Sequence, residues 1–200
     1  MEFDFRALVV IMMSAVFVNN YILRQFLGVC PFLGVTKEFK SSVGMGLAVV
    51  FVMLMAAAVT WPIQIFVLDV NGLGYMQTVV FILVIATLVQ LVEVVLKRYI
   101  PVLFTSLGVY LALMTTNCAV LAVTNSSVSK GYTYLEALTS AFGSGLGFFL
   151  AMLLFTGVRG HTAAADPPDS FKGVPITLIS AAILSLAFFG FEGVIDNLFG

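Results

Sequence analysis

Six long apolar runs place the tightest limit on what this 200-residue chain can fold into. Each run is about 20 residues or longer, the length that a helix needs to cross roughly 30 Å of hydrocarbon. Hydrophobic residues make up 61% of the sequence and charged residues only 10%, whereas about a quarter of the residues in soluble domains are charged. We therefore expect an all-α polytopic membrane protein, with one membrane domain over residues 1–200 and six transmembrane helices near residues 5–26, 42–63, 75–96, 101–123, 134–157 and 174–195.

The basic residues predict the orientation of these spans. Arg6 and Lys130 lie on one side of the membrane, whereas seven basic residues fall in the connections after the first, third and fifth spans. Because basic connections stay in the cytoplasm, both termini are expected on the outer side. The sequence lacks a basic tract interleaved with aromatic residues, so we expect contact with membrane lipid and none with nucleic acid. The seven residues are Arg24, Lys37, Lys40, Lys97, Arg98, Arg159 and Lys172.

An internal repeat divides the chain into halves of about residues 1–98 and 99–200. Residues 41–54 align without a gap on residues 140–153, so that position n pairs with position n + 99. Each half contains three spans, and this odd number forces the second half to enter the membrane from the opposite side. The expected fold is therefore two inverted three-helix repeats, an architecture whose functional sites lie near the bilayer midplane on broken helices. The identical pairs are Ser41/Ser140, Gly44/Gly143, Gly46/Gly145, Leu47/Leu146, Met53/Met152 and Leu54/Leu153.

The two cysteines of the chain lie at equivalent places in this repeat. Cys30 begins Cys-Pro-Phe-Leu-Gly-Val and Cys118 begins Cys-Ala-Val-Leu-Ala-Val, each in the first span of its half or just after it. Residues 7–35 are too long for one straight span at about 1.5 Å per residue, so we expect this first helix to break and re-enter. The polar residues 115–117 suggest a similar break in the fourth span. Inversion would then bring the two cysteines together near the midplane. The residues expected to permit the first break are Asn19, Asn20, Gly28, Pro31 and Gly34.

Three interpretations of the cysteines are open from the residues alone. Both can be small buried thiols without a role, since free cysteine is among the most buried residue types. A structural disulfide is disfavoured because Cys30 falls on the predicted cytoplasmic half, where thiols stay reduced. Thiolates are also soft ligands for copper(I), zinc or iron-sulfur clusters, and a [2Fe-2S] cluster needs four ligands. The equivalent positions in the repeat favour ligation, with a homologous partner protein supplying the other two thiolates.

Five segments of the sequence resemble a known family. They are similar to the A-type membrane protein of the Rnf complex, the ion-translocating ferredoxin:NAD oxidoreductase that is also called the SoxR-reducing complex. The sister family, the E-type membrane protein of the sodium-translocating NADH:quinone reductase, usually has Glu-Asn where this chain has Asn19-Asn20. The resemblance covers essentially the whole chain. The five segments are residues 18–23, 26–37, 44–48, 115–120 and 178–191.

The resemblance implies a function for the whole complex and a cofactor role for this chain. Cys30 and Cys118 match ligands of an intramembrane [2Fe-2S] cluster, which is completed by the homologous E-type protein among the other Rnf subunits. The chain would then be one component of a translocase-type oxidoreductase in the bacterial inner membrane. It would relay electrons across that membrane, coupled to Na⁺ or H⁺ transport. No catalytic residue is expected in this chain itself.

Several polar residues in or near the spans leave alternatives open. Asn20, Thr115, Thr116 and Asn117 either line a cation route, donate hydrogen bonds to cluster sulfurs, or cap the broken helices. Glu93 precedes Lys97 by one helical turn, which suits an ion pair, although an acid within a membrane span is also a candidate for an ion path. A competing class of function is a secondary transporter without redox chemistry, built on the same inverted halves.

Overall fold

The computed structural model describes residues 5–36, 39–70, 72, 74–99, 117–165 and 168–190, and every regular element in these ranges is helical. Three helices are long and apolar enough to cross a membrane: residues 39–69, 74–94 and 134–162. Three shorter apolar helices accompany them, which confirms an all-α polytopic membrane fold. The α-helices are α1 (Phe5–Met13), α2 (Val29–Val35), α3 (Phe39–Ile63), α4 (Gln77–Tyr99), α6 (Cys118–Ser129), α7 (Tyr134–Ala164) and α8 (Val174–Phe189).

Four short segments of tighter or wider helix adjoin these α-helices. Two are π-helical, and each continues a preceding α-helix, so that α1 and α3 both end in a π segment. The other two are single 3₁₀ turns that precede α4 and α8. The segments are η1 (Ser14–Val18), η2 (Gln64–Asp69), η3 (Gly74–Met76) and η4 (Asp169–Phe171).

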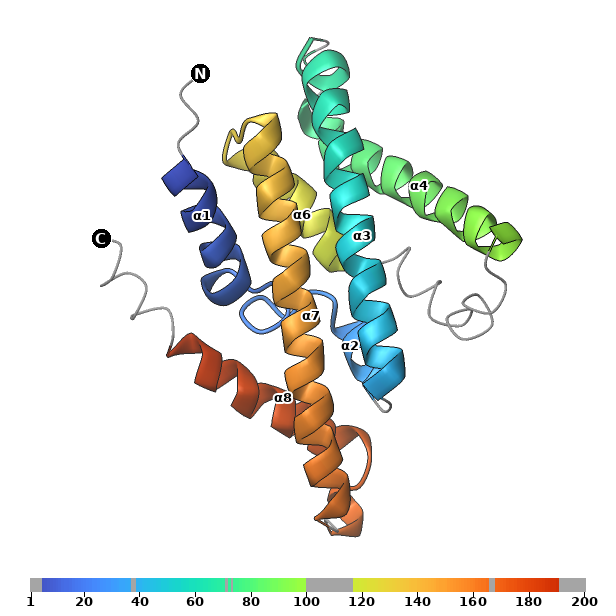
Figure 1. Ribbon diagram of the computed structural model, residues 1–200, viewed down its shortest axis with the longest axis vertical. Helices are drawn as coiled ribbons and strands as arrows, with labels where there is room; N and C mark the ends of the chain where they lie inside the picture. The colour runs from blue at the N-terminus through green and yellow to red at the C-terminus, as the bar shows by residue number, and fades with distance from the viewer. Residues whose placement is uncertain are drawn as a thin grey trace.

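The antiparallel helices α3 and α7 form the centre of the bundle, as Figure 1 shows. Small residues allow their backbones to approach closely, as is common between membrane helices. A Cβ atom at Gly145 would lie 3.0 Å from the Cα of Val50, and one at Gly46 would overlap the ring of Phe149. The glycines of the internal repeat therefore lie in the contact between these two helices.

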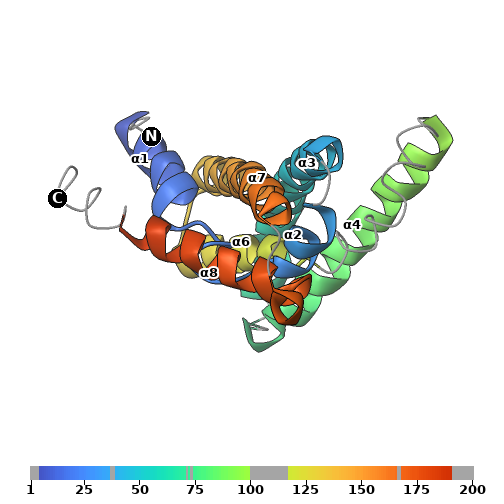
Figure 2. The same ribbon diagram turned by 90° about the horizontal axis from the view of Figure 1, so that it is seen from below.

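The buried core lies where the short helices α2 and α6 pack against the central pair (Figure 2). Phe32 of α2 stacks on Phe155 of α7 with ring centroids 4.2 Å apart. Outside this core, α4 and α8 expose large apolar side chains such as Leu83 and Ile183, which suits helices that contact lipid. The bundle is thus apolar both inside and on its flanks.

The observed helix ends differ from the predicted span ends at three places. Helix α6 continues to Ser129 instead of ending near residue 123, because the hydroxyls of Thr124 and Ser127 donate to carbonyls one turn back and so are satisfied within the helix. Helix α3 passes through Pro62 and continues as η2 to Asp69, where π-helical geometry follows the missing proline N–H. Helix α7 continues to Ala164.

Two of the predicted spans are only partly covered by the described residues. Residues 101–116 of the predicted fourth span and residues 191–195 of the sixth lie outside them. The part of the fourth span that the structure describes is the start of α6, which contains Cys118.

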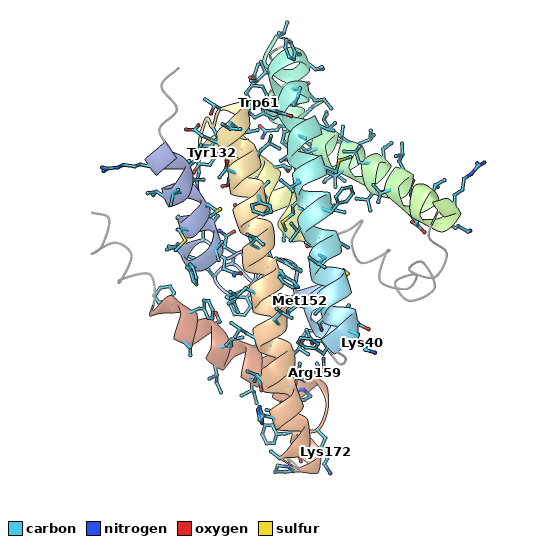
Figure 3. The ribbon with its side chains drawn as sticks, viewed as in Figure 1. Lys40, Trp61, Tyr132, Met152, Arg159 and Lys172 are labelled. Atoms are coloured by element: carbon cyan, nitrogen blue, oxygen red, sulfur yellow. The ribbon has the colours of Figure 1, made fainter. Side chains whose placement is uncertain are left out.

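Basic and aromatic side chains separate toward the two ends of the bundle. Lys40, Arg159 and Lys172 lie toward one end, whereas Trp61 and Tyr132 lie toward the other (Figure 3). Basic residues at one end and an interfacial aromatic pair at the other are the pattern expected of a protein oriented in a membrane. The basic end is the one that the sequence assigns to the cytoplasm.

Candidate functional site

The first helix breaks after η1, within the region that the sequence predicted. The chain leaves helical geometry at Asn19 and Asn20 and re-enters it at Val29. Two residues of the break have left-handed backbone geometry, Phe26 with φ 54° and Gly28 with φ 80°. Of the residues expected to permit the break, Pro31 and Gly34 instead lie inside α2, since a proline is tolerated in the first turn of a helix.

Asn20 holds this break against α7. Its side chain is 2% exposed, and its Nδ2 donates to the carbonyl of Gly147 at 2.8 Å. Its Oδ1 accepts from the N–H groups of Ile22 at 3.1 Å and Leu23 at 3.4 Å. The amide therefore satisfies backbone groups that the interrupted helix leaves unpaired.

Two glycines of α7 provide the room for this contact. A Cβ at Gly147 would lie 3.0 Å from the carbonyl oxygen of Val16, and one at Gly143 would lie 3.0 Å from that of Met12. The Gly-Ser-Gly-Leu-Gly run of residues 143–147 is therefore a close-packing surface within a helix.

The second half-helix, α6, begins at Cys118. Asn117 precedes it as the N-cap, with its Oδ1 accepting from the N–H of Ala119 at 3.0 Å. The positive end of the helix dipole lies at this first turn and favours the thiolate form of a cysteine placed there. The candidates Thr115 and Thr116 lie outside the described residues.

The starts of α2 and α6 are in direct contact. A Cβ at Gly28 would lie 2.9 Å from Asn117 Oδ1 and 3.2 Å from the Cβ of Ala119. Gly28 is two residues before Cys30, and Asn117 and Ala119 flank Cys118. The structure therefore brings together two cysteine-bearing helix starts that are 88 positions apart in the sequence (118 − 30).

Each half-helix is tied at its other end to a long helix. The guanidinium of Arg159 on α7 donates to the carbonyl of Leu33 at 2.8 Å and to Thr36 Oγ1 at 3.0 Å, next to the end of α2. The indole of Trp61 on α3 donates to the carbonyl of Tyr132 at 2.9 Å, just beyond the end of α6. Because Arg159 and Tyr132 lie toward opposite ends of the bundle, α2 and α6 run outward in opposite directions from their shared starting point (Figure 3).

Both thiols lie on the surface of the chain. Cys30 and Cys118 are exposed, and no disulfide joins them. Within the part of the chain that the structure describes, no group of three or more His, Cys, Asp or Glu side chains gathers to hold a metal. Two accessible thiols on adjoining helix starts fit one half of a four-thiolate site, with the remaining ligands coming from outside the chain.

The other predicted site residues divide into near and far. Asn117 is 5% exposed and adjoins Cys118; its Nδ2 is buried and has no hydrogen-bond partner among the described residues. Glu93 lies near the C-terminal end of α4, which diverges from the rest of the bundle in Figures 1 and 2. The ion pair expected between Glu93 and Lys97 stays a prediction.

Sequence reasoning missed two of the anchors of this site. Gly147 stood in a recognised glycine run, but nothing in the sequence indicated that its carbonyl accepts from Asn20. Arg159 was assigned only to a basic connection, whereas it lies within α7 and binds the end of α2. A basic residue two turns inside an extended helix would have been the signal.

Comparison with known proteins matches nearly all of the chain to one family. The family model described as "Rnf-Nqr subunit, membrane protein" matches residues 8–195. The chain belongs to the Rnf-Nqr family of membrane subunits. The resemblance found in the sequence is thereby confirmed.

Relatives within the Rnf-Nqr family are similar along their full length, and the three compared here are all A-type subunits of their complexes. That of the Na(+)-translocating ferredoxin:NAD(+) oxidoreductase complex of Acetobacterium woodii is 49% identical over 187 residues, which is 94% of this chain and 97% of the relative. That of the ion-translocating oxidoreductase complex of Syntrophotalea carbinolica is 48% identical over 190 residues, 95% of this chain and 98% of the relative. That of Serratia proteamaculans is 46% identical over 182 residues, 91% and 94%.

Proposed function

We propose that this chain is the A-type membrane component of an ion-translocating Rnf oxidoreductase complex, in which Cys30 and Cys118 hold one half of an intramembrane [2Fe-2S] cluster. The observation that carries the proposal is the contact of Gly28 with Asn117 and Ala119, which joins the two cysteine-bearing helix starts. The exposure of both thiols supports a site that a second protein completes. The names of the relatives favour the Rnf branch over the E-type protein of the sodium-translocating NADH:quinone reductase.

Reciprocal contacts in the bundle support the inverted repeat on which this site depends. Gly46 packs on Phe149, and Gly145 packs on Val50. Positions 46 and 145 differ by 99, as do positions 50 and 149, so each contact is the image of the other under the sequence repeat. Such reciprocity is expected when an approximate two-fold axis relates two halves, and it favours halves near residues 1–98 and 99–200.

The anchoring of the half-helices supports the same arrangement. Helix α2 belongs to the first half but is bound by Arg159 of the second, and the chain after α6 belongs to the second half but is bound by Trp61 of the first. Each half therefore positions the cysteine segment of the other. Two inverted units that exchange supports in this way would keep both cysteines near the middle of the membrane.

The residues of this chain would bind and orient the cluster, and exclude solvent from it. When bound, the cluster supplies a one-electron carrier between the cytoplasmic and outer sides of the bilayer. Cys30 and Cys118 provide two of its thiolates, the homologous E-type protein provides the other two, and the buried amide of Asn117 is a further donor nearby. Negative charge gained on reduction attracts a cation in low dielectric, which couples electron passage to Na⁺ or H⁺ movement. The complex would lie in the bacterial inner membrane with both termini of this chain outside.

Iron content of this chain purified with its E-type partner tests the cluster. The pair with intact cysteines is expected to be coloured and to hold about two iron atoms, the content of one [2Fe-2S] cluster. Cys30→Ser or Cys118→Ser is expected to abolish both properties, since each removes a ligand. Ala122→Ser, which introduces a hydroxyl elsewhere on α6, serves as the matched control and keeps the iron. A colourless, iron-free pair with intact cysteines would refute the proposal.

One observation favours a second function, a secondary transporter without redox chemistry. Two half-helices that meet start to start inside a bundle, as α2 and α6 do at Gly28, are also the architecture of substrate sites in inverted-repeat transporters. For such a transporter, the iron-free pair would be fully active, and serine at either cysteine would leave transport unchanged.

A further inference from the structure

A polar cavity of about 160 Å³ lies between the first helix and α7. Its walls come from α1 and η1, from the break after them, from the α6–α7 connection and from α7. Neither cysteine contributes to its lining, so it is separate from the site proposed above. The polar lining residues are Ser14, Asn19, Tyr21, Lys130, Tyr132, Ser140 and Ser144.

The wall of the cavity contains a buried hydroxyl without a partner. Ser144 is 4% exposed, and its Oγ makes no hydrogen bond to the described residues. Buried polar groups are nearly always hydrogen-bonded, so this hydroxyl indicates that something outside the chain occupies the cavity. Ser14 Oγ accepts from Asn19 Nδ2 at 3.0 Å and keeps its own proton for a second bond.

The charge of the lining selects an anion over a cation. Lys130 is the charged residue among the lining residues, and no Asp or Glu accompanies it there. Its Nζ lies 5.6 Å from the centre of the Tyr132 ring, on the connection that closes the cavity. Hard cations prefer carboxylate and carbonyl ligands, whereas an ammonium group with several hydroxyl donors suits an oxyanion.

The cavity also lies at the depth of lipid headgroups. Tyr132 accepts from the indole of Trp61, and the Trp61 ring meets that of Tyr134 edge to face at 5.3 Å. Tryptophan and tyrosine rings gather at the membrane–water interface, where the phosphates of the lipids are found. Figure 3 places Trp61 and Tyr132 at the end of the bundle opposite to Lys40 and Lys172.

The geometry points to a phosphate-binding site in this cavity, in which Lys130 and the hydroxyls of Ser14, Ser140 and Ser144 hold the oxygens of a phosphate group. The phosphate belongs either to a phospholipid headgroup or to free inorganic phosphate, because both present the same oxygens. Its binding ties α1 to α7 beside the break that precedes Cys30.

The test uses the intact complex purified in a phosphate-free buffer. Tightly bound phospholipid is counted by native mass spectrometry, and the thermal stability of a delipidated sample is measured during titration with inorganic phosphate. Lys130→Gln is compared with Lys40→Gln, a matched loss of charge at the opposite end. Ser144→Ala is compared with Ser129→Ala, an exposed serine that bonds within its own helix.

The expected result is about tenfold weaker binding in Lys130→Gln, the loss of one charge-assisted contact, with Lys40→Gln unchanged. Loss of retained phospholipid identifies the headgroup as the source, and loss of phosphate-induced stabilisation alone identifies the free ion. An empty or water-filled cavity predicts that the variants at 130 and 40 match in both measurements, and that Ser144→Ala raises thermal stability by removing an unpartnered hydroxyl. Either outcome would overturn the phosphate site and leave the cluster proposal intact.

Discussion

The two half-helices that carry the cysteines are stabilised in different ways. Helix α6 has twelve residues, an Asn117 cap at its start, and a C-terminal end closed by the N–H of Lys130 on the carbonyl of Ser126. Helix α2 has seven residues, begins after a left-handed Gly28 without a side-chain cap, and depends on Arg159 of α7 at its other end. The local sequence therefore defines α6, whereas tertiary contacts define α2.

The largest expected effect comes from Gly28→Ala. The new Cβ meets both the φ of 80° and atoms of Asn117 and Phe148 at 2.9 Å, so we expect a loss of about 3 kcal/mol in the stability of α2. Hydrogen exchange of residues 29–35 in the purified complex measures it. Gly72→Ala is the control, since Gly72 has a φ of 64° but no atom within 4 Å of an added Cβ. Equal effects at the two glycines would show that the α2–α6 contact is not close.

Removal of the tertiary anchor has the next largest effect. Arg159→Met leaves the Leu33 carbonyl and Thr36 without their donor, at a cost of about 2 kcal/mol for a charged donor. Exchange is expected to accelerate in α2 and to stay unchanged in α6. Arg159→Lys, which keeps one donor and the charge, is expected to recover part of the protection. Uniform acceleration in both helices would contradict the difference drawn between them.

Substitutions of Asn117 separate its cap from its free amide donor. Asn117→Ala removes the cap and is expected to cost α6 about 1 kcal/mol, whereas Asn117→Ser keeps a capping oxygen. Both variants remove Nδ2, and loss of a hydrogen bond to a cluster sulfur makes reduction harder. A redox titration followed by the spectrum of the cluster is therefore expected to give a lower midpoint potential in both. An unchanged potential in Asn117→Ser would leave Asn117 as a cap only.

The smallest effect is expected at the anchor beyond α6. Trp61→Phe removes the bond to the Tyr132 carbonyl but keeps an aromatic ring against Tyr134, so the cost is below about 1 kcal/mol. Exchange of residues 130–134 is expected to rise slightly, with α6 itself unaffected because its end is closed locally. A loss as large as that of Arg159→Met would mean that α6 depends on tertiary support as much as α2 does.

The same contrast explains how much of the structure the sequence could predict. Apolar runs and composition identified the helices, because burial in lipid requires long apolar segments whose backbone is bonded internally. The break after Val18 followed from a run too long for one span. The ends of α6 and α7 were placed too early, because polar residues such as Thr124 and Arg159 find partners within or across helices that a hydropathy pattern does not contain.

The candidate site was predictable in its cysteines and not in its supports. Cys30 and Cys118 were recognised from their equivalent motifs, and the structure brings their helix starts together through Gly28. The supporting contacts, Asn20 with Gly147 and Arg159 with Leu33, join residues 127 and 126 positions apart. Such pairs follow only from the three-dimensional path of the chain.

Electron paramagnetic resonance of the reduced pair, this chain with its E-type partner, tests the central claim most directly. A [2Fe-2S] cluster that Cys30 and Cys118 share with the partner predicts the signal of a single spin-½ centre, which Cys118→Ser abolishes and Ala122→Ser preserves. A signal that survives Cys118→Ser without change, or a reduced pair of intact proteins that gives none, would contradict it.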